Sequence, residues 1–248
     1  GLGLALAKHY LASGDQVIAC GRDHAKLESA FAQNTDESAS EHTATNISDR
    51  LLLCVCDVSQ RQSSFDALSH FKDLDIVILN AGTCEYVDDP MSIDSELFSR
   101  VMQTNVMGVV HCLQALLPNI KRGGQLAVVS SSVTVLPLTR SEAYGASKAA
   151  LDYLTRSLAI DLSQHGIDVS LISPGFVDTP LTQKNDFPMP GLVSVERAKN
   201  YIVRGLSSRK RHIVFPRRFY WSLKALSLLP NGLWHRLAVK MVRPGNER

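Results

Sequence analysis

The sequence predicts an α/β fold in which one parallel sheet lies between two layers of helices. Short apolar runs alternate along the chain with longer segments of helical periodicity, which is typical of strand–helix–strand units. The expected strands cover residues 17–20, 51–56, 76–79, 125–130 and 168–172. Polar or glycine-containing motifs follow most of these strands, and ligands of such sheets bind at the carboxyl ends of the strands. We therefore expect a single doubly wound, three-layer α/β/α domain with its site along that edge.

Helices are expected between these strands. They cover residues 4–13, 23–33, 62–71, 94–117, 142–165 and 195–206. Gly14 follows the first of them and provides the left-handed residue that commonly ends a helix. Residues 34–49 are polar and rich in Ser and Thr, so they are expected to form a loop.

Composition favours one globular domain in a reducing compartment. The 248 residues are 45% hydrophobic, which is enough for a large single core. Five cysteines, an odd number without a Cys-x-x-Cys pair, indicate reduced core residues and a cytoplasmic location. No apolar run approaches the roughly eighteen residues of a membrane-spanning helix. No metal site is predicted.

Three side chains form the strongest chemical signal. Tyr144 and Lys148 are four positions apart at the start of the expected helix 142–165, so they share one face of it. Ser131 follows the strand 125–130, thirteen positions before Tyr144. A lysine ammonium favours the tyrosinate and lowers the phenol's pKa, while the serine hydroxyl can hold a substrate oxygen. This pattern predicts a proton-transfer site.

These residues resemble the short-chain dehydrogenase/reductase family, which has a Ser and a Tyr-x-x-x-Lys at this spacing. Further family motifs occur in the family's order: Gly1-Leu-Gly3, Asp57-Val58, Asn80-Ala-Gly82, Asn105 and Pro174-Gly-Phe-Val-Asp-Thr179. The resemblance implies a Rossmann-type cofactor-binding and catalytic domain over residues 1–206, with a substrate loop at about 180–194. The alternative is a doubly wound domain that carries a coincidental Tyr/Lys pair.

The glycine-rich loop departs from the family pattern. The family has Thr-Gly-x-x-x-Gly-x-Gly between its first strand and first helix, whereas this chain begins at the second glycine without an initiator Met. We therefore expect an N-terminally incomplete copy that lacks the first strand of the sheet.

Arg22 bears on the choice of cofactor. A carboxylate at the end of the second family strand would accept a hydrogen bond from the ribose 2′-hydroxyl and repel a 2′-phosphate. Here Gly21 occupies that place and Arg22 follows it, so Arg22 could form a charge-assisted hydrogen bond with a 2′-phosphate. NADP(H) is therefore predicted, with NAD(H) as the alternative. Asp23 is expected to cap the following helix.

The resemblance assigns other residues to the cofactor. The backbone of Gly1, Leu2 and Gly3 would approach the pyrophosphate at a helix N-terminus. Residues placed near the adenosine are Asp57, Val58, Asn80, Ala81 and Gly82. Residues placed near the nicotinamide and its ribose are Tyr144, Lys148, Pro174, Gly175, Val177 and Thr179. A bare tight turn is the alternative for the glycines, and helix capping is the alternative for Asp57.

The implied reaction is hydride transfer between NADP(H) and an apolar carbonyl or secondary alcohol. Ser131 and Tyr144 would bind the substrate oxygen, and Tyr144 would exchange its proton. Lys148 and Asn105 would continue the proton relay through a water, although Asn105 could instead be a satisfied core amide. Rival functions are a non-catalytic redox sensor, an NAD-preferring dehydrogenase, and an epimerase or dehydratase. A homodimer or homotetramer built on helices 94–117 and 142–165 is expected.

A basic amphipathic extension is predicted at residues 207–248, packed on the same domain. From Arg204 onward the chain has eleven of its 26 basic residues but only one of its 24 acidic residues. Leu and aromatic side chains alternate with these bases. The apolar face is expected to cover the substrate pocket or a neighbouring subunit, or else to contact a membrane surface. Nucleic-acid binding fits less well, because nothing else in the chain forms a basic reading element.

Overall fold

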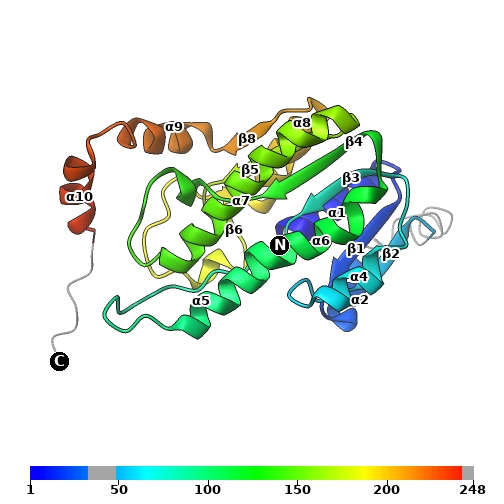
Figure 1. Cartoon of the computed structure of the whole chain (residues 1–248), viewed down its shortest axis with the longest axis horizontal. Helices are drawn as coiled ribbons and strands as arrows, with labels where there is room; N and C mark the ends of the chain where they lie inside the picture. The colour runs from blue at the N-terminus through cyan, green and yellow to red at the C-terminus, as the bar shows by residue number, and fades with distance from the viewer. Residues whose placement is uncertain (33–48, 242–248) are drawn as a thin grey trace.

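Parallel strands form the centre of the molecule, and helices cover both sides (Figure 1). The computed structural model describes residues 1–32 and 49–241. Its strands are β1 (Val17–Gly21), β2 (Leu51–Val55), β3 (Leu74–Leu79), β4 (Ile120–Val129), β5 (Asp168–Pro174), β6 (Val177–Asp178), β7 (Val193–Ser194) and β8 (His212–Phe215). Its α-helices are α1 (Leu2–Ala12), α2 (His24–Ala32), α4 (Arg61–Leu68), α5 (Ser95–Met102), α6 (Gly108–Leu116), α7 (Glu142–Asp161), α8 (Val195–Ser207), α9 (Arg217–Leu226) and α10 (Asn231–Val239). The predicted doubly wound α/β architecture is confirmed.

The strand ladders fall into separate groups. A four-stranded sheet has the order β3-β4-β5-β8, and β1 pairs with β2 in a second sheet. Within the described ranges no strand ladder joins β1 to β3. A short third pair links β6 to β7, which brackets the expected substrate loop. All of these ladders are parallel.

Two apolar cores lie on opposite sides of the sheet. One includes residues of α4, α6 and α7 packed against β2 to β5, with Leu126 and Leu151 fully buried. The other includes residues of α1 and α8 packed against β4, β5 and β8, with Ile202 and Phe215 fully buried. Burial of apolar area in these layers, at about 25 cal/mol per Å², is the main stabilising contribution.

Most predicted elements are present, with local differences. The predicted helix 94–117 consists of α5, a π-helical turn over Gln103–Met107 and α6. Asp94 caps its start by accepting from the Glu96 amide at 2.8 Å. The sheet continues past residue 206, because β8 pairs with β5. The predicted loop 34–49 lies almost entirely outside the described residues.

The cysteines only partly match the expectation of core residues. All five are free, and Cys54, Cys56 and Cys112 are buried. Cys20, by contrast, is exposed on β1, and Cys84 is half-buried in the loop after β3. The prediction of core cysteines is therefore wrong for these two. In the part of the chain that the structure describes, no helix combines the length and apolarity needed to span a bilayer.

Candidate active site

Ser131 and Tyr144 meet at the carboxyl end of β4. Ser131 is the N-cap of the short 3-10 turn Ser132–Val135, where its Oγ accepts from the Val133 amide at 3.2 Å. Tyr144 lies in the first turn of α7 and is half-buried. The Ser131 side chain interacts with the Tyr144 phenol in the direction that favours the tyrosinate. The two hydroxyl groups can therefore act on the same substrate oxygen.

The neighbouring serine is used differently. Ser130 is buried, and its Oγ hydrogen-bonds Oδ1 of Asp152 and the Lys148 carbonyl oxygen. It therefore anchors β4 to α7, whereas the Ser131 side chain interacts with Tyr144. This agrees with the alternation of side-chain direction along an extended chain.

Lys148 is buried one turn after Tyr144 on α7. Its Nζ donates to the Val129 carbonyl oxygen at 3.0 Å and lies 5.8 Å from the centroid of the Tyr144 ring. Burial lowers the pKa of Lys148 to about 8. The ammonium is therefore held inside the protein beside the phenol, in a position where it gives up its proton easily.

Tyr144 does not show the pKa shift that the sequence predicts. Burial raises its pKa to about 12, the neighbouring Cys84 adds to the rise, and Ser131 opposes it. Desolvation disfavours the charged phenolate, and the Lys148 ammonium points to the Val129 carbonyl. With a pKa of about 12, the phenol is protonated at neutral pH and is available as a proton donor.

Asn105 lies in the π-helical turn and has no exposed surface. Its Nδ2 donates to the Thr83 carbonyl oxygen and to Ser147 Oγ, both at 2.9 Å, and its Oδ1 accepts from the Thr83 amide at 2.7 Å. The amide therefore fastens the loop after β3 to α7. A π-helical turn inside an α-helix often marks a functional site.

Gly82 lies close to both Asn105 and Lys148. A Cβ atom built there would lie 3.3 Å from Asn105 Oδ1 and 3.4 Å from Lys148 Nζ. The glycine thus leaves room for the backbone to pass between these two groups. Such close approach is a physical reason for glycine at this position.

The N-terminus of α1 has the features of a phosphate-binding site. A Cβ built on Gly3 would lie only 2.8 Å from Nδ2 of Asn80, so only glycine lets α1 approach the end of β3 this closely. Gly1 is the N-cap residue of α1 and offers no side-chain cap to the first turn. Free amides and the helix dipole favour an anion there. These residues fit a dinucleotide pyrophosphate.

Arg22 is exposed directly after β1, next to Gly21. The neighbouring Asp23 accepts from the Lys26 amide at 3.1 Å, which confirms its capping role at the start of α2. The Arg22 side chain is therefore at the end of a strand where an adenosine ribose is expected to bind.

The other residues that the sequence assigns to the adenosine make contacts within the protein. Asp57 Oδ1 accepts from the amide and the hydroxyl of Ser59, at 3.0 and 2.7 Å, so it stabilises the turn before α4. Gln60 is the N-cap of α4, which shows that Asp57 is not. Val58 packs against Gly108, and its carbonyl oxygen lies 2.9 Å from His111 Nδ1. Asn80, Ala81 and Gly82 follow β3.

The predicted nicotinamide residues follow β5. Pro174 ends that strand, and the Gly175 amide donates to the Phe215 carbonyl oxygen at 2.7 Å. Val177 pairs with Val193 in the short β6–β7 ladder. The Thr179 amide donates to Thr182 Oγ1 at 3.0 Å, and the two threonine hydroxyls lie 3.3 Å apart. Thr182 therefore positions Thr179, a role that the sequence analysis did not assign.

Aromatic residues that the sequence analysis did not single out surround the substrate loop. Tyr86 donates from its hydroxyl to Asn185 Oδ1 at 2.7 Å, and its ring centroid lies 5.7 Å from that of Phe187. Phe176 contacts the rings of Phe187 and Phe219, with centroids 6.0 and 5.8 Å away. This group comes from the loop after β3, the loop after β5, the substrate loop and α9. Only the fold brings them together.

Cys84 and Arg140 are two further residues of this region. The Cys84 thiol interacts with Tyr86 and lies near enough to Lys148 and Tyr144 to influence their pKa values. Arg140 forms ion pairs with Asp88 and, at 2.9 Å, with Asp186 of the substrate loop. Its guanidinium also lies 5.0 Å from the centroid of the Tyr86 ring. Arg140 thus ties the loop after β3 to the substrate loop.

Comparisons with known proteins identify the family of this chain. The family model described as short chain dehydrogenase matches residues 1–188. The chain belongs to the short-chain dehydrogenase/reductase family of oxidoreductases. An uncharacterised oxidoreductase of Myxococcus xanthus is 29% identical over 97% of this chain and 93% of its own length. An uncharacterised oxidoreductase of Staphylococcus epidermidis is 32% identical over 75% of this chain and 78% of its own length.

Solved structures of two dehydrogenases have the same fold. A short-chain dehydrogenase from Streptomyces avermitilis aligns with a TM-score of 0.75 and 22% identity, covering 100% of this chain and 95% of that chain. An alcohol dehydrogenase from Thermococcus sibiricus, solved with 5-hydroxy-NADP, aligns with a TM-score of 0.72 and 23% identity, covering 87% and 91%.

Proposed function

We propose that this oxidoreductase transfers a hydride between NADP(H) and an apolar carbonyl or secondary alcohol. The observation that carries the proposal is the arrangement of Ser131, Tyr144 and the buried Lys148 at the carboxyl end of β4. A protonated phenol beside a serine hydroxyl and a buried ammonium suits protonation of a carbonyl oxygen. A protein that only binds the cofactor and catalyses no reaction would not need these three side chains.

The roles of the side chains follow from their positions. Ser131 orients the substrate oxygen, and Tyr144 donates its proton to that oxygen in the reductive direction. Lys148 binds the ribose next to the nicotinamide and replaces the proton of Tyr144. Asn105 holds the turn that keeps Lys148 and Tyr144 aligned through Ser147. Bound along this edge, the nicotinamide ring supplies or accepts the hydride.

The cofactor choice rests on Arg22. It is exposed at the end of β1, and the preceding Gly21 presents no carboxylate that would repel a 2′-phosphate. Gly1, Leu2 and Gly3 would hold the pyrophosphate, and Asp57, Val58, Asn80, Ala81 and Gly82 the adenosine. Pro174, Gly175, Val177 and Thr179 would hold the nicotinamide.

The aromatic side chains around the predicted substrate loop support an apolar substrate. Tyr86, Phe176, Phe187 and Phe219 form a continuous series of ring contacts beside the loop that carries Cys84. Aromatic walls bind apolar groups through buried area. The carbonyl would be held by Ser131 and Tyr144 while the rest of the substrate contacts these rings.

Assembly through α7 is part of the proposal. Tyr153 and Ile160 on this helix are 81% and 73% exposed, which is unusual for large apolar side chains on a helix of a single domain. Met107 of the π-helical turn and Val110 of α6 are also exposed. A homodimer or homotetramer would bury them. We also propose a cytoplasmic location.

Turnover of a panel of carbonyl compounds with NADPH tests the function. Ketones, aldehydes, sterols and acyl thioesters should be compared by the loss of NADPH absorbance. We expect oxidation of NADPH with at least one apolar ketone or aldehyde, and none for the Tyr144→Phe variant. Tight NADPH binding without turnover of any compound would instead support a redox sensor.

A further inference from the structure

The segment that contains α9 and α10 carries basic charge without acidic charge. Between Arg197 and Met241 the sequence contains no Asp or Glu. Five exposed basic residues belong to the two helices and their ends: Arg217, Arg218, Lys224, Arg236 and Lys240. An anionic partner would therefore meet no negative charge that repels it from this segment.

α9 has one face on the protein and one face in solvent. Tyr220 and Leu223 are buried, and the ring of Phe219 contacts Phe176. On the opposite side, Trp221 is 62% exposed, and Leu228 just beyond the helix is 85% exposed. The helix is thus firmly attached and still presents large apolar side chains to solvent.

α10 is more exposed than α9, since none of its residues is buried. Nε1 of Trp234 donates to the Pro137 carbonyl oxygen at 3.2 Å, which attaches the helix to the loop after Ser131. Leu233, Leu237 and Met241 remain 39–57% exposed. They are spaced four residues apart and therefore form one stripe along the helix.

A basic stripe runs beside this apolar stripe. Arg236 and Lys240 are also four residues apart, so they lie together on the neighbouring face of α10. An apolar stripe next to a basic stripe is the arrangement of helices that lie in the interface of a membrane. A water-exposed helix without a partner normally avoids such a stripe.

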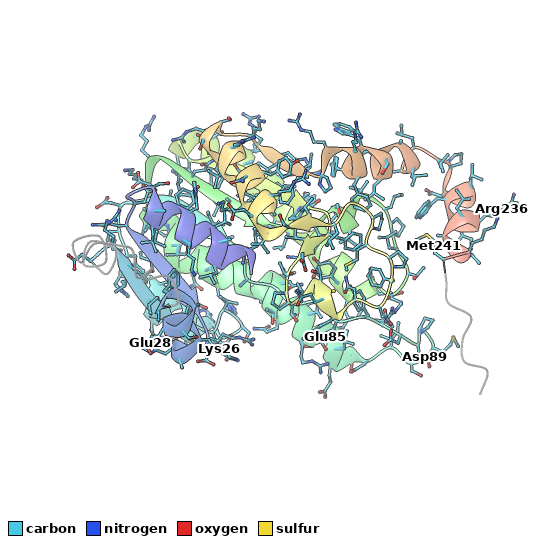
Figure 2. The ribbon with its side chains drawn as sticks, turned by 180° about the vertical axis from the view of Figure 1, so that it is seen from behind. Lys26, Glu28, Glu85, Asp89, Arg236 and Met241 are labelled. Atoms are coloured by element: carbon cyan, nitrogen blue, oxygen red, sulfur yellow. The ribbon has the colours of Figure 1, made fainter. Side chains whose placement is uncertain are left out.

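This surface lies at one end of the molecule. Figure 1 shows α10 beyond the end of α9, and Figure 2 shows Arg236 and Met241 at the opposite end from Lys26 and Glu28. The attachment points are on the substrate side of the site, since Pro137 follows Ser131 by six residues and Phe219 contacts the loop after β5.

We propose that α9 and α10 form a lipid-binding surface that attaches the protein to anionic bilayers. We call it the tail surface; its apolar residues are Trp221, Leu228, Leu233, Leu237 and Met241, and its basic residues are the five given above. Attachment places the aromatic substrate side next to the bilayer. That placement would give the active site access to a carbonyl compound dissolved in the bilayer, a consequence that rests on the proposed function.

Co-sedimentation with vesicles tests the proposal without cofactor or substrate, so its result is independent of catalysis. The protein should bind vesicles of mixed phosphatidylcholine and phosphatidylglycerol at low salt, and bind pure phosphatidylcholine vesicles far more weakly. High salt should weaken binding, because it screens the attraction between lysine or arginine and the lipid. Binding that is equal on both vesicle types would overturn the charge argument.

Paired variants separate the two stripes. Arg236→Gln with Lys240→Gln should lower the partition coefficient roughly 10-fold to 30-fold, about fivefold per charge. Leu233→Ser with Leu237→Ser should lower it by roughly tenfold or more, because both leucines lose their contact with lipid. The controls Lys26→Gln with Lys72→Gln, and Leu52→Ser with Phe65→Ser, remove two exposed basic or two exposed apolar side chains elsewhere and should bind as the unaltered protein does.

Two outcomes contradict the proposal. The first is absence of vesicle binding at low salt by protein whose circular dichroism and melting temperature are normal. The second is that the Leu233→Ser, Leu237→Ser variant dissociates an oligomer in light scattering while vesicle binding is absent throughout. The tail surface would then be covered by a second copy of the chain.

Discussion

Nζ of Lys148 lies 5.8 Å from the centroid of the Tyr144 ring, and one helix carries both residues. The ammonium is fixed by the Val129 carbonyl at 3.0 Å, so β4 and α7 together determine its distance from the phenol. Burial moves the two pKa values in opposite directions, to about 8 for Lys148 and about 12 for Tyr144. The raised pKa of Tyr144 keeps the phenol protonated, and the lowered pKa of Lys148 makes its ammonium the easier group to deprotonate.

Removal of the phenol hydroxyl should abolish turnover while cofactor binding persists. Tyr144→Phe keeps the ring that packs beside Lys148 and removes only the proton donor. We expect kcat to fall about 10²–10⁴-fold, the usual contribution of a general acid. Steady-state rates and fluorescence titration with NADPH measure the two effects separately. A variant with near-normal reduction rates would remove Tyr144 from the proposed mechanism.

The depressed pKa of Lys148 should appear in the pH dependence of stability. Its pKa is about 8 in the folded protein against an ordinary value of 10.5, so between these values the unfolded chain binds the extra proton. The free energy of unfolding should therefore rise from pH 8 to 10, by at most about 1.4 kcal/mol per pH unit from this residue. Below pH 8 both states are protonated and this contribution becomes constant.

Lys148→Met removes that titration. Urea unfolding of the cofactor-free protein at several pH values should give a flatter profile between pH 8 and 10 for the variant than for the unaltered protein. Parallel profiles would mean that the Lys148 ammonium is well solvated in the folded state.

The sequence predicted those site residues that occupy fixed places on regular elements. Ser131 at the end of β4 and the Tyr144–Lys148 pair on α7 follow from strand alternation and helical periodicity, and the structure places both Ser131 and Lys148 beside Tyr144. The poor helix propensity of Asn105 indicated a special position. Propensity could not show that the backbone forms a π-helical turn there, because that depends on the contacts of Asn105 with Thr83 and Ser147.

Other parts of the site depend on contacts between distant segments. Arg140 and Asp186 are 46 residues apart and meet only because α7, the loop after β3 and the substrate loop converge. Cys84 was interpreted as a core residue, and nothing local distinguishes it from one. β8 was not predicted, since its four residues lie next to a basic run without a clear periodicity.

Arg22 should discriminate between the two cofactors. Arg22→Ala is expected to weaken NADPH binding by roughly 10-fold to 150-fold, equivalent to 1.5–3 kcal/mol for one lost charge-assisted bond, and to leave NADH binding nearly unchanged. Isothermal titration with both cofactors measures this. Lys26→Ala, which alters an exposed base on α2 that pairs with Asp23, is the control. Equal losses for NADPH and NADH would show that Arg22 does not contact the 2′-phosphate.

Arg140 should matter for substrate binding through the loop that it holds. Arg140→Ala removes the ion pairs to Asp88 and Asp186 and the contact with the Tyr86 ring. We expect the substrate KM to rise about threefold to tenfold, with cofactor affinity unchanged, because partly exposed ion pairs contribute about 1 kcal/mol or less each. Arg209→Ala is a matched control, since Arg140 and Arg209 both have a positive φ, and Arg209 pairs with the exposed Asp168. An equal rise in KM for both variants would contradict a specific role of Arg140.

The outer face of α7 should determine the oligomeric state. Tyr153→Asp with Ile160→Asp places two charges where a two-fold partner would pack, and unpaired buried charges are strongly destabilising to an interface. Size-exclusion chromatography with light scattering should show a dimer or tetramer for the unaltered protein and a monomer for this variant, at micromolar concentration. Val55→Asp on β2 is the control, because Val55 is 48% exposed on a different element. A monomeric unaltered protein would refute the assembly, and an unchanged oligomer in the α7 variant would assign its contacts to another surface.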